Sequence, residues 1–308
     1  MNAKTKKRKI SSGPVGKKTK GDYIFEAVNL AVFLLFTLLC FFPFYYLAIN
    51  TISDNAEVFK GAVTFFPTGI HFDNYAALRY VSNLGRSLWI TVSSTILSTV
   101  LMVFVSAFAG YIFTKQKMWH RKFWYRFTII PMYFNAGLLP WFLNMHSLGL
   151  TDNYLAYILP NLVVPFNIIM VKTYIESVPQ DIEESAGVDG AGTLTVFFRI
   201  MCPLCVPILA TISIWGAVSR WNSFQDSLVL MATSPRLFTL QHRLYIYLTQ
   251  SNNLEQLMGS GLSGNLANLN QKVVQYTVSV VSILPIVLVY PFMQRYFISG
   301  IMMGAVKG

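Results

Sequence analysis

Charged residues are scarce in this chain of 308 residues, because aspartate, glutamate, lysine and arginine together make up only 12% of it. A soluble globular domain carries about 25% charged residues. Hydrophobic residues account for 54% of the sequence, and many of them stand in long runs. The scarcity of charge excludes a soluble globular enzyme as the default interpretation and favours a membrane protein.

Clusters of catalytic or metal-binding side chains are also lacking. The four histidines are dispersed, and no His-Glu-x-x-His pattern is present. Cys202 and Cys205 form a C-x-x-C pair without a second pair or a nearby histidine, so packing explains them better than a redox or metal site. The stretch Gly16–Thr19 lacks the leading glycine and the strand of a phosphate-binding loop. We therefore expect no metal site, no cofactor and no enzymatic activity in this chain.

Basic residues are concentrated at the N-terminus. The net charge is +11, and eight of the 24 lysines and arginines precede Asp22. Such a run is typical of a disordered segment that faces the cytoplasm and anionic lipid headgroups. We expect residues 1–22 to form a basic cytoplasmic tail, residues 23–308 to form a membrane domain, and nucleic acid not to be a partner.

Six charge-free stretches are long enough for the roughly 20 apolar residues that cross a bilayer. The first is too long for the apolar core of a signal peptide, so we expect it to be retained. The last four contain or adjoin pairs of prolines, which bend membrane helices. The sequence therefore predicts an all-α polytopic membrane protein with six transmembrane helices. The stretches are Ala27–Ser53, Ser87–Thr114, Phe127–Thr151, Asn153–Val171, Ile200–Ser219 and Val273–Gln294.

The distribution of charge in the loops predicts the orientation. The loop Lys115–Arg126 holds five basic residues and no acid, which indicates the cytoplasmic side. Alternation then places both termini in the cytoplasm and the segments 54–86 and 221–272 outside. The second external segment ends in a run rich in glycine, serine and asparagine, which favours a loop.

One polar stretch, Pro179–Pro203, interrupts the hydrophobic runs. Pro179 suits the first turn of a helix, where negative side chains favour the positive end of the helix dipole. Three acids follow it: Asp181, Glu183 and Glu184. Gly190 and Gly192 permit a tight reversal before a second short helix at 193–200. Two short helices joined at a glycine elbow form a compact unit that is too polar for lipid.

The spacing in this stretch resembles the EAA loop of ATP-binding-cassette (ABC) importers. That pattern is Glu-Ala-Ala, three residues, Gly, nine residues, Ile, any residue, Leu, Pro. The matching positions are Glu184, Ala186, Gly190, Ile200 and Pro203. Ser185 and Cys202 depart from the pattern, but both are small or apolar and leave the elbow intact.

From Ala27 onward the chain resembles the permease subunit of a carbohydrate-uptake ABC importer of the maltose-transporter type. Within that family it is similar to the branch for complex oligosaccharides and polysaccharide fragments. The resemblance implies a type I permease fold in a prokaryotic plasma membrane and import of a carbohydrate into the cytoplasm. The segment from Phe66 to Tyr75 and the C-terminal residues 304–308 carry it together with the loop.

The resemblance also implies partners. A second homologous permease would complete the path, and two cytoplasmic ATPase subunits would bind ATP and magnesium and hydrolyse the nucleotide. An extracytoplasmic solute-binding protein would deliver the solute. The loop, residues 177–203 on the cytoplasmic side, would couple ATPase closure to alternating access. The residues expected to do so are Asp181, Glu183, Glu184, Ser185, Ala186, Gly187 and Gly190.

Uncharged polar and aromatic side chains in the crossings are candidates for the solute path. Amides with aromatic faces suit a neutral, hydroxyl-rich ligand such as a sugar, although each alone more often makes a helix–helix hydrogen bond. No charged residue lies deep in a predicted crossing, which favours a neutral oligosaccharide and disfavours an ion relay. The candidates are Asn135, Trp141, Asn161, Asn167, Trp215 and Asn222.

Two other classes of protein remain as alternatives. An ion-coupled secondary transporter would need ion sites or repeat symmetry near the midplane. An integral-membrane glycosyltransferase would need clustered carboxylates, and the only acidic cluster, 181–189, is explained by the loop spacing. The sequence leaves open which sugar is carried, its length, and whether this subunit contacts it.

Overall fold

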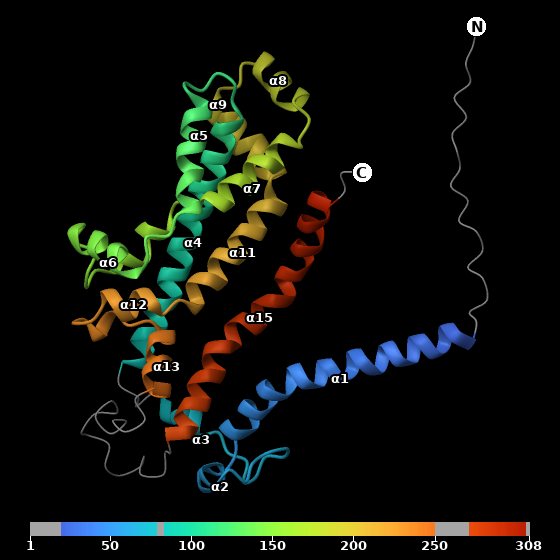
Figure 1. The fold of residues 1–308 in the computed structure, drawn as a ribbon, viewed down its shortest axis with the longest axis vertical. Helices are drawn as coiled ribbons and strands as arrows, with labels where there is room; N and C mark the ends of the chain where they lie inside the picture. Colours follow the sequence, from blue (N-terminus) through green and yellow to red (C-terminus); the bar gives the residue numbers. More distant parts are fainter. Residues whose placement is uncertain (1–19, 79–82, 250–270, 306–308) are drawn as a thin grey trace. The chain divides into compact units, whose positions relative to one another are not determined.

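Helices form nearly all of the regular structure in this computed structural model, which describes residues 20–78, 83–249 and 271–305. No strand occurs in these ranges, so the expected all-α class is confirmed. The chain divides into two units, Met1–Leu47 and Ala48–Gly308. Figure 1 shows the helices with their labels. Most of the predicted basic tail lies outside the described residues.

The first unit consists of most of helix α1, Lys20–Thr51. Its 32 residues span about 48 Å at 1.5 Å each, more than the roughly 30 Å of a hydrocarbon core. An apolar window within it has a mean hydropathy of 2.3. The helix begins seven residues before the expected crossing, and it qualifies by length and composition as a membrane span.

The second unit begins with the last turn of α1 and the short helices α2 (Asn55–Lys60) and α3 (Asp73–Ala77). The Asn74 amide donates to the carbonyl of Thr51 at 2.9 Å, and the hydroxyls of Thr51 and Tyr75 are 2.7 Å apart. Asp54 caps α2 by accepting from two backbone amides. These hydrogen bonds hold α2 and α3, which belong to the predicted external segment 54–86, against the last turn of α1.

The centre of the second unit is formed by α4 (Leu84–Thr114), α7 (Pro165–Glu176) and α11 (Val206–Asn222), which lie side by side in Figure 1. A Cβ on Gly110 would stand 2.9 Å from Val171 Cγ1 and 3.1 Å from the Lys172 backbone nitrogen. The absence of a side chain at Gly110 therefore allows α4 and α7 to approach closely. Gly216 likewise leaves room for Met102, whose Cε would be 2.2 Å from a Cβ there.

Two of the expected crossings are bent rather than straight. The segments η3 (Tyr154–Tyr157) and η4 (Leu159–Asn161) meet α7 at 43°. The run α9 (Thr193–Val196), η5 (Phe197–Met201, a π-helix) and α10 (Cys202–Leu204) meets α11 at 79°. Prolines begin or adjoin both breaks, as the sequence predicted: Pro160, Pro165, Pro203 and Pro207.

The expected third crossing, Phe127–Thr151, is wrong as a single helix. Its residues belong to α5 (Arg121–Ile129), η2 (Ile130–Tyr133) and α6 (Leu138–Ser147). Proline lacks the amide proton of a helical bond, and Pro131 stands in η2. Gly137 then adopts a φ of 85°, which few other residues accept, so the helix cannot continue.

The count of six is therefore not confirmed. Among the described residues three helices could cross a membrane, or five if each bent pair is one span. The last of them belongs to α15, Gln271–Ala305. The orientation of the termini stays a prediction.

The predicted external segment 221–272 is largely helical where it is described. It contains α12 (Gln225–Leu230), η6 (Pro235–Leu237) and α13 (Leu240–Thr249). Tyr157 joins this layer to the bent crossing, because its hydroxyl donates to the carbonyl of Leu237 at 2.7 Å. The run that was expected to be a loop, residues 250–270, lies outside the described residues.

Candidate functional site

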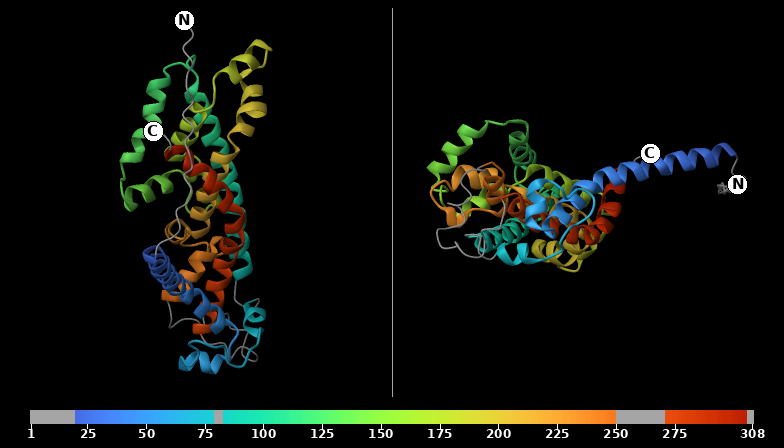
Figure 2. Two further views of the ribbon diagram at one scale, coloured as in Figure 1. Left: turned by 90° about the vertical axis from the view of Figure 1, so that its right-hand side faces the viewer. Right: turned by 90° about the horizontal axis from the view of Figure 1, so that it is seen from below.

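The polar stretch forms the expected elbow of two short helices, α8 (Asp181–Val188) and α9. Gly190 adopts a φ of 79°, whereas Gly192 has an ordinary φ of −71°. The amide of Ala191 reaches back to the carbonyl of Ala186 at 3.0 Å, which closes the end of α8. Figures 1 and 2 show this elbow at the same end of α4 as α5. Of the two predicted turn glycines, only Gly190 adopts a left-handed φ, which glycine favours.

The inner face of α8 is fastened to the end of α4. The Glu183 carboxylate forms an ion pair with Lys115, the first residue after α4. The Tyr111 hydroxyl lies 3.5 Å from the same Glu183 oxygen and 3.4 Å from the carbonyl of Thr193. The Lys115 ammonium also lies 3.8 Å from the centre of the Tyr111 ring. Glu183 therefore ties the elbow to α4 instead of facing outward with the other acids. Ala186, on the same face, packs against the adjoining core.

The outer face of α8 presents the other predicted coupling residues to the surroundings. Asp181, Glu184 and Val188 share this face at helical spacing, and all three are exposed, Val188 by 88%. Within the described part of the chain no ion pair involves Glu184. Ser185 is exposed too and returns its hydroxyl to the carbonyl of Asp181 at 2.6 Å. A Cβ on Gly187 would meet open space. The outer face thus offers acids around an apolar tip.

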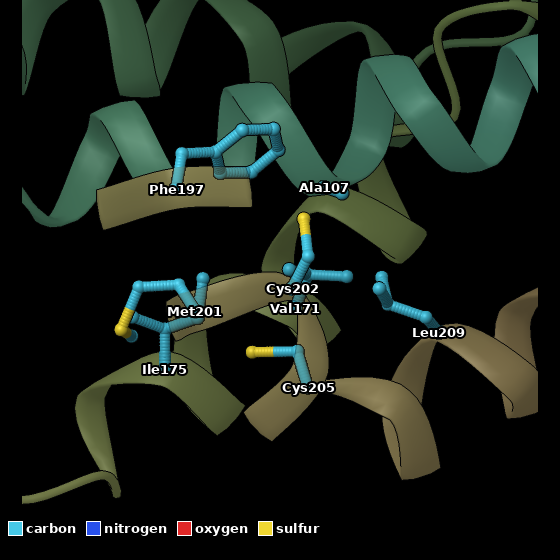
Figure 3. Close-up of a pocket in the computed structure, with 8 residues that line it drawn as sticks. All are labelled: Ala107, Val171, Ile175, Phe197, Met201, Cys202, Cys205 and Leu209. Carbon is cyan, nitrogen blue, oxygen red and sulfur yellow. The ribbon is translucent and has the colours of Figure 1, made fainter. Parts of the chain in front are cut away.

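The core behind the elbow is tightly packed. Figure 3 shows Phe197 and Met201 of η5 with Cys202 and Cys205 around Val171. The space between these side chains is too small to hold a water molecule. Both cysteines are free thiols, and Cys205 is buried. The cysteine pair therefore has the packing role that the sequence favoured.

A cavity of about 270 Å³ lies between α4, α7 and α11. It brings together three of the residues predicted for the solute path, Asn161, Asn167 and Trp215. The Asn167 amide donates to Met102 Sδ at 2.9 Å. The rings of Phe166 and Trp215 stack with centroids 5.8 Å apart. The rest of the lining consists of Ser98, Thr99, Val164, Gly216, Ser219 and Arg220.

The other three predicted path residues lie elsewhere. Asn135 is exposed, and its side-chain oxygen accepts from the Gly137 amide in the turn before α6. Trp141 packs on a different core cluster. Asn222 closes the end of α11 by donating to the carbonyl of Val218 at 2.9 Å. Each of these three residues therefore has a local structural role, which is the more common role of a single asparagine or tryptophan.

Arg220, the residue after the predicted fifth crossing, continues α11 and is buried in the bundle. Arg220 lines the cavity and is only 6% exposed. It pairs with Asp226 of α12 through both terminal nitrogens, and the Nη2–Oδ1 distance is 3.2 Å. Burial would raise the pKa of Asp226, but hydrogen bonds from Arg220 and Ser223 outweigh it and hold that pKa below its usual value. The pair is therefore ionised and neutral as a whole.

A buried histidine in the same layer makes stability depend on pH. His242 of α13 lies 2.9 Å from the Ser227 hydroxyl. Burial, helped by the charge of Arg243 and opposed by that of Asp226, lowers the pKa of His242 from 6.5 to about 4. The folded protein therefore holds neutral imidazole, while the unfolded chain takes up a proton below about pH 6.5.

Stability is accordingly expected to be constant above pH 6.5 and to fall between pH 6.5 and 4. Thermal unfolding of the purified protein at pH 7.5, 6 and 5 measures this. The His242→Gln variant keeps a hydrogen-bonding group but cannot titrate there, so its melting temperature should fall less. An equal fall in both proteins would show that His242 is not responsible.

Comparisons with known proteins agree on one family. Residues 102–303 match the model of a family described as "binding-protein-dependent transport system inner membrane component". The chain is 30% identical over 291 residues to the polygalacturonan/rhamnogalacturonan transport system permease protein YtcP of Bacillus subtilis, covering 92% of this chain and 99% of that protein. It is 29% identical to the arabinooligosaccharides transport system permease protein AraQ of Halalkalibacterium halodurans, covering 90% and 94%.

Solved structures give the same result. A chain of a bacterial ABC transporter involved in the import of the acidic polysaccharide alginate superposes with a TM-score of 0.83. That chain is 31% identical, and the match covers 92% of this chain and 100% of that one. A bacterial alginate ABC transporter in complex with an alginate pentasaccharide-bound periplasmic protein shares the fold alone, at 14% identity and a TM-score of 0.55.

Proposed function

Because the chain belongs to the family of binding-protein-dependent transport system inner membrane components, we propose that it is the permease subunit of an ATP-driven oligosaccharide importer. The observation that carries the proposal is the α8–α9 elbow. Its outer face presents Glu184 and Val188 for a partner, while its inner face is tied to α4 through Glu183 and Lys115. A surface that both meets a partner and holds a membrane helix can transmit motion between them.

The partners follow from what an importer of this design requires. Two cytoplasmic ATPase subunits bind ATP and magnesium and seat the elbows, and a second permease completes the path. An extracytoplasmic solute-binding protein delivers the oligosaccharide. This chain supplies the coupling surface and one wall of the path.

The mechanism is an exchange between two states of one bundle. When the ATPases close, the elbow moves, and the Lys115–Glu183 pair carries that displacement to α4. α7 follows α4 because they are in close contact at Gly110. The bent crossings then exchange inward for outward access. ATP drives the cycle because it binds the two states with different affinity.

The solute class is supported by the relatives and by the cavity. The relatives named above belong to transport systems for polygalacturonan and rhamnogalacturonan, for arabinooligosaccharides and for alginate. The cavity offers amides, hydroxyls and a stacked aromatic pair, which suit a hydroxyl-rich ligand. A neutral or mostly hydroxylated oligosaccharide stays our prediction, since Asp226 compensates the charge of Arg220.

Assembly and coupled hydrolysis test the proposal directly. The chain is expected to co-purify with a second permease and an ATPase when the subunits are expressed together. In proteoliposomes, ATP hydrolysis should rise when the solute-binding protein is added with an oligosaccharide mixture. The same vesicles without this chain are the control. A chain that transports solute alone, driven by a proton or sodium gradient, would contradict the proposal and favour a secondary transporter.

A further inference from the structure

The loop between α4 and α5, together with the first turns of α5, carries positive charge that the structure leaves uncompensated. Of its five lysines and arginines, Lys115 pairs with Glu183, and Arg121 donates to the carbonyl of Thr114 at 3.0 Å. The stretch from 115 to 126 contains no acid. The other three basic residues are exposed, and among the described residues they form no ion pair: Lys117, Lys122 and Arg126.

An exposed aromatic patch lies beside these charges. It consists of Trp119, Phe123, Trp124 and Phe127, which are all exposed, Trp119 by 71%. Their rings are in contact, because the ring centres of Trp124 lie 6.0 Å from Phe127 and 6.4 Å from Trp119, and those of Phe123 and Phe127 are 6.2 Å apart. A contiguous apolar patch at a surface marks a site that binds a membrane or another protein.

The aromatic patch lies on the outer side of α5, away from the bundle. The inner side is marked by Tyr125, whose ring centre lies 5.4 Å from that of Phe113 of α4. At 3.6 residues per turn, Phe123 and Phe127 point away from Tyr125, and the two unpaired basic residues of α5 lie along one edge of the aromatic patch. The outer face of α5 therefore combines a basic edge with an aromatic surface.

The length of α4 indicates the depth of this face in the membrane. Its 31 residues span about 46 Å at 1.5 Å each, which slightly exceeds the roughly 40–45 Å of a bilayer with its headgroups. The end of α4 at Thr114 therefore reaches the headgroup region on the side predicted to be cytoplasmic. From there α5 runs back along the bundle (Figures 1 and 2). Tryptophan is enriched at this level of membrane proteins, and the cytoplasmic leaflet is anionic.

Charge decides between lipid and a second protein subunit as the partner of this face. Lysine is depleted in protein–protein interfaces, and burying three unpaired positive charges in one costs free energy. An anionic lipid instead offers a phosphate to the charges and acyl chains to the rings, as for other basic and aromatic helices at membrane interfaces.

We propose that the outer face of α5 binds an anionic phospholipid of the cytoplasmic leaflet. Its headgroup phosphate is held by Lys117, Lys122 and Arg126, and its acyl chains pack on the aromatic patch. This binding goes beyond the proposed function. It depends on the predicted cytoplasmic position of the loop and not on the solute.

The test places the full chain, with the subunits that co-purify with it, in nanodiscs of phosphatidylcholine with a rising fraction of phosphatidylglycerol. In one series the phosphatidylglycerol carries brominated acyl chains, which quench tryptophan fluorescence on contact. In the other series the same fraction of brominated phosphatidylcholine is used. The part of the quenching that is lost in the variant Trp119→Phe/Trp124→Phe reports on this face alone and leaves out lipid bound by the basic tail.

Brominated phosphatidylglycerol is expected to quench these two tryptophans half-maximally at about 1% of the lipid, because each of three basic residues beside an anionic lipid contributes about fivefold. Arg126→Gln should move this fraction to about 4%, and Lys122→Gln/Arg126→Gln to about 17%. Arg199→Gln is the matched control, since Arg199 of η5 is also exposed, beside the elbow, and without an ion pair among the described residues. It should keep the wild-type value.

Four results would overturn the proposal. The wild type could be quenched equally by both brominated lipids at every fraction. Lys122→Gln/Arg126→Gln could keep the wild-type fraction with a normal melting temperature. Arg199→Gln could shift as much as Arg126→Gln, which would show unspecific attraction to this end of the bundle. Little quenching of Trp119 and Trp124 by either lipid would show that another subunit covers the face, which is then a protein interface.

Discussion

Replacing Glu184 with lysine is expected to abolish solute-stimulated ATP hydrolysis and uptake while membrane insertion remains normal. Glu184 is exposed on the outer face of α8, with no ion pair in the described part of the chain. If that face meets a basic rim on the ATPase, lysine there sets like charges together at a partly desolvated contact, which costs several kcal/mol. Glu184→Gln only removes the attraction, so it should reduce hydrolysis without abolishing it.

The geometry of the elbow is tested separately from its charge by Gly190 and Gly192. At a φ of 79°, a residue with a Cβ is strained by about 1–2 kcal/mol, and a β-branched one by more. A Cβ at either glycine would meet open space, so strain and not collision separates them. Gly190→Val should uncouple hydrolysis from solute, Gly190→Asn should be tolerated, and Gly192→Ala should behave as the wild type. Stimulated hydrolysis at the normal rate in both Glu184→Lys and Gly190→Val would show that the elbow is not the coupling element.

Reversing either charge of the Lys115–Glu183 pair is expected to reduce uptake at least fivefold, and reversing both should restore most of it. Each single reversal leaves two like charges beside the Tyr111 ring, where the side chains are only 21% and 37% exposed. The repulsion loosens the elbow from α4, so ATPase closure moves the elbow without the helix. Lys115→Glu combined with Glu183→Lys re-forms the ion pair in the opposite order.

Uptake and ATP hydrolysis should be measured for both single variants and the double variant, because the non-additive part isolates the pair. Hydrolysis is expected to persist in the single variants while uptake falls, which distinguishes a lost transmission from a lost ATPase contact. Lys172→Glu is a matched control, since Lys172 forms an ion pair with Glu176 within α7. An additive double variant would contradict a direct role for the Lys115–Glu183 pair.

The elbow could be predicted from the sequence because its rules are local. Three acids after Pro179 and a glycine at the correct spacing determine two short helices and one left-handed turn, and the structure has all three between residues 181 and 196. The different roles of Glu183 and Glu184 could not be predicted in this way. Neighbouring residues on a helix point about 100° apart, so only the position of α4 decides which acid faces Lys115.

Hydropathy alone predicts the wrong helix bounds where segments distant in the sequence meet. The expected third crossing has no charged residue, yet Pro131 and Gly137 divide it. The expected fifth crossing ends at Ser219 because a charged residue follows. In the structure Arg220 continues α11, and Asp226 beyond the end of the helix compensates its charge. A sequence signal for the polar cavity is the run of serines and threonines from residue 91 to 99 in the middle of an apolar helix.

The close contact at Gly110 gives α4 and α7 the properties of a lever. The tether at Tyr111 and the cavity residue Thr99 are twelve residues apart on one helix, which corresponds to an arm of about 18 Å. Since Val171 and the Lys172 backbone lie against Gly110, α7 has to move together with α4. If α4 tilts by about 10° about the tether, Thr99 moves by about 3 Å at this arm length. That displacement is about the width of a water molecule, so a small rotation at the elbow can open or close a passage in the middle of the bundle.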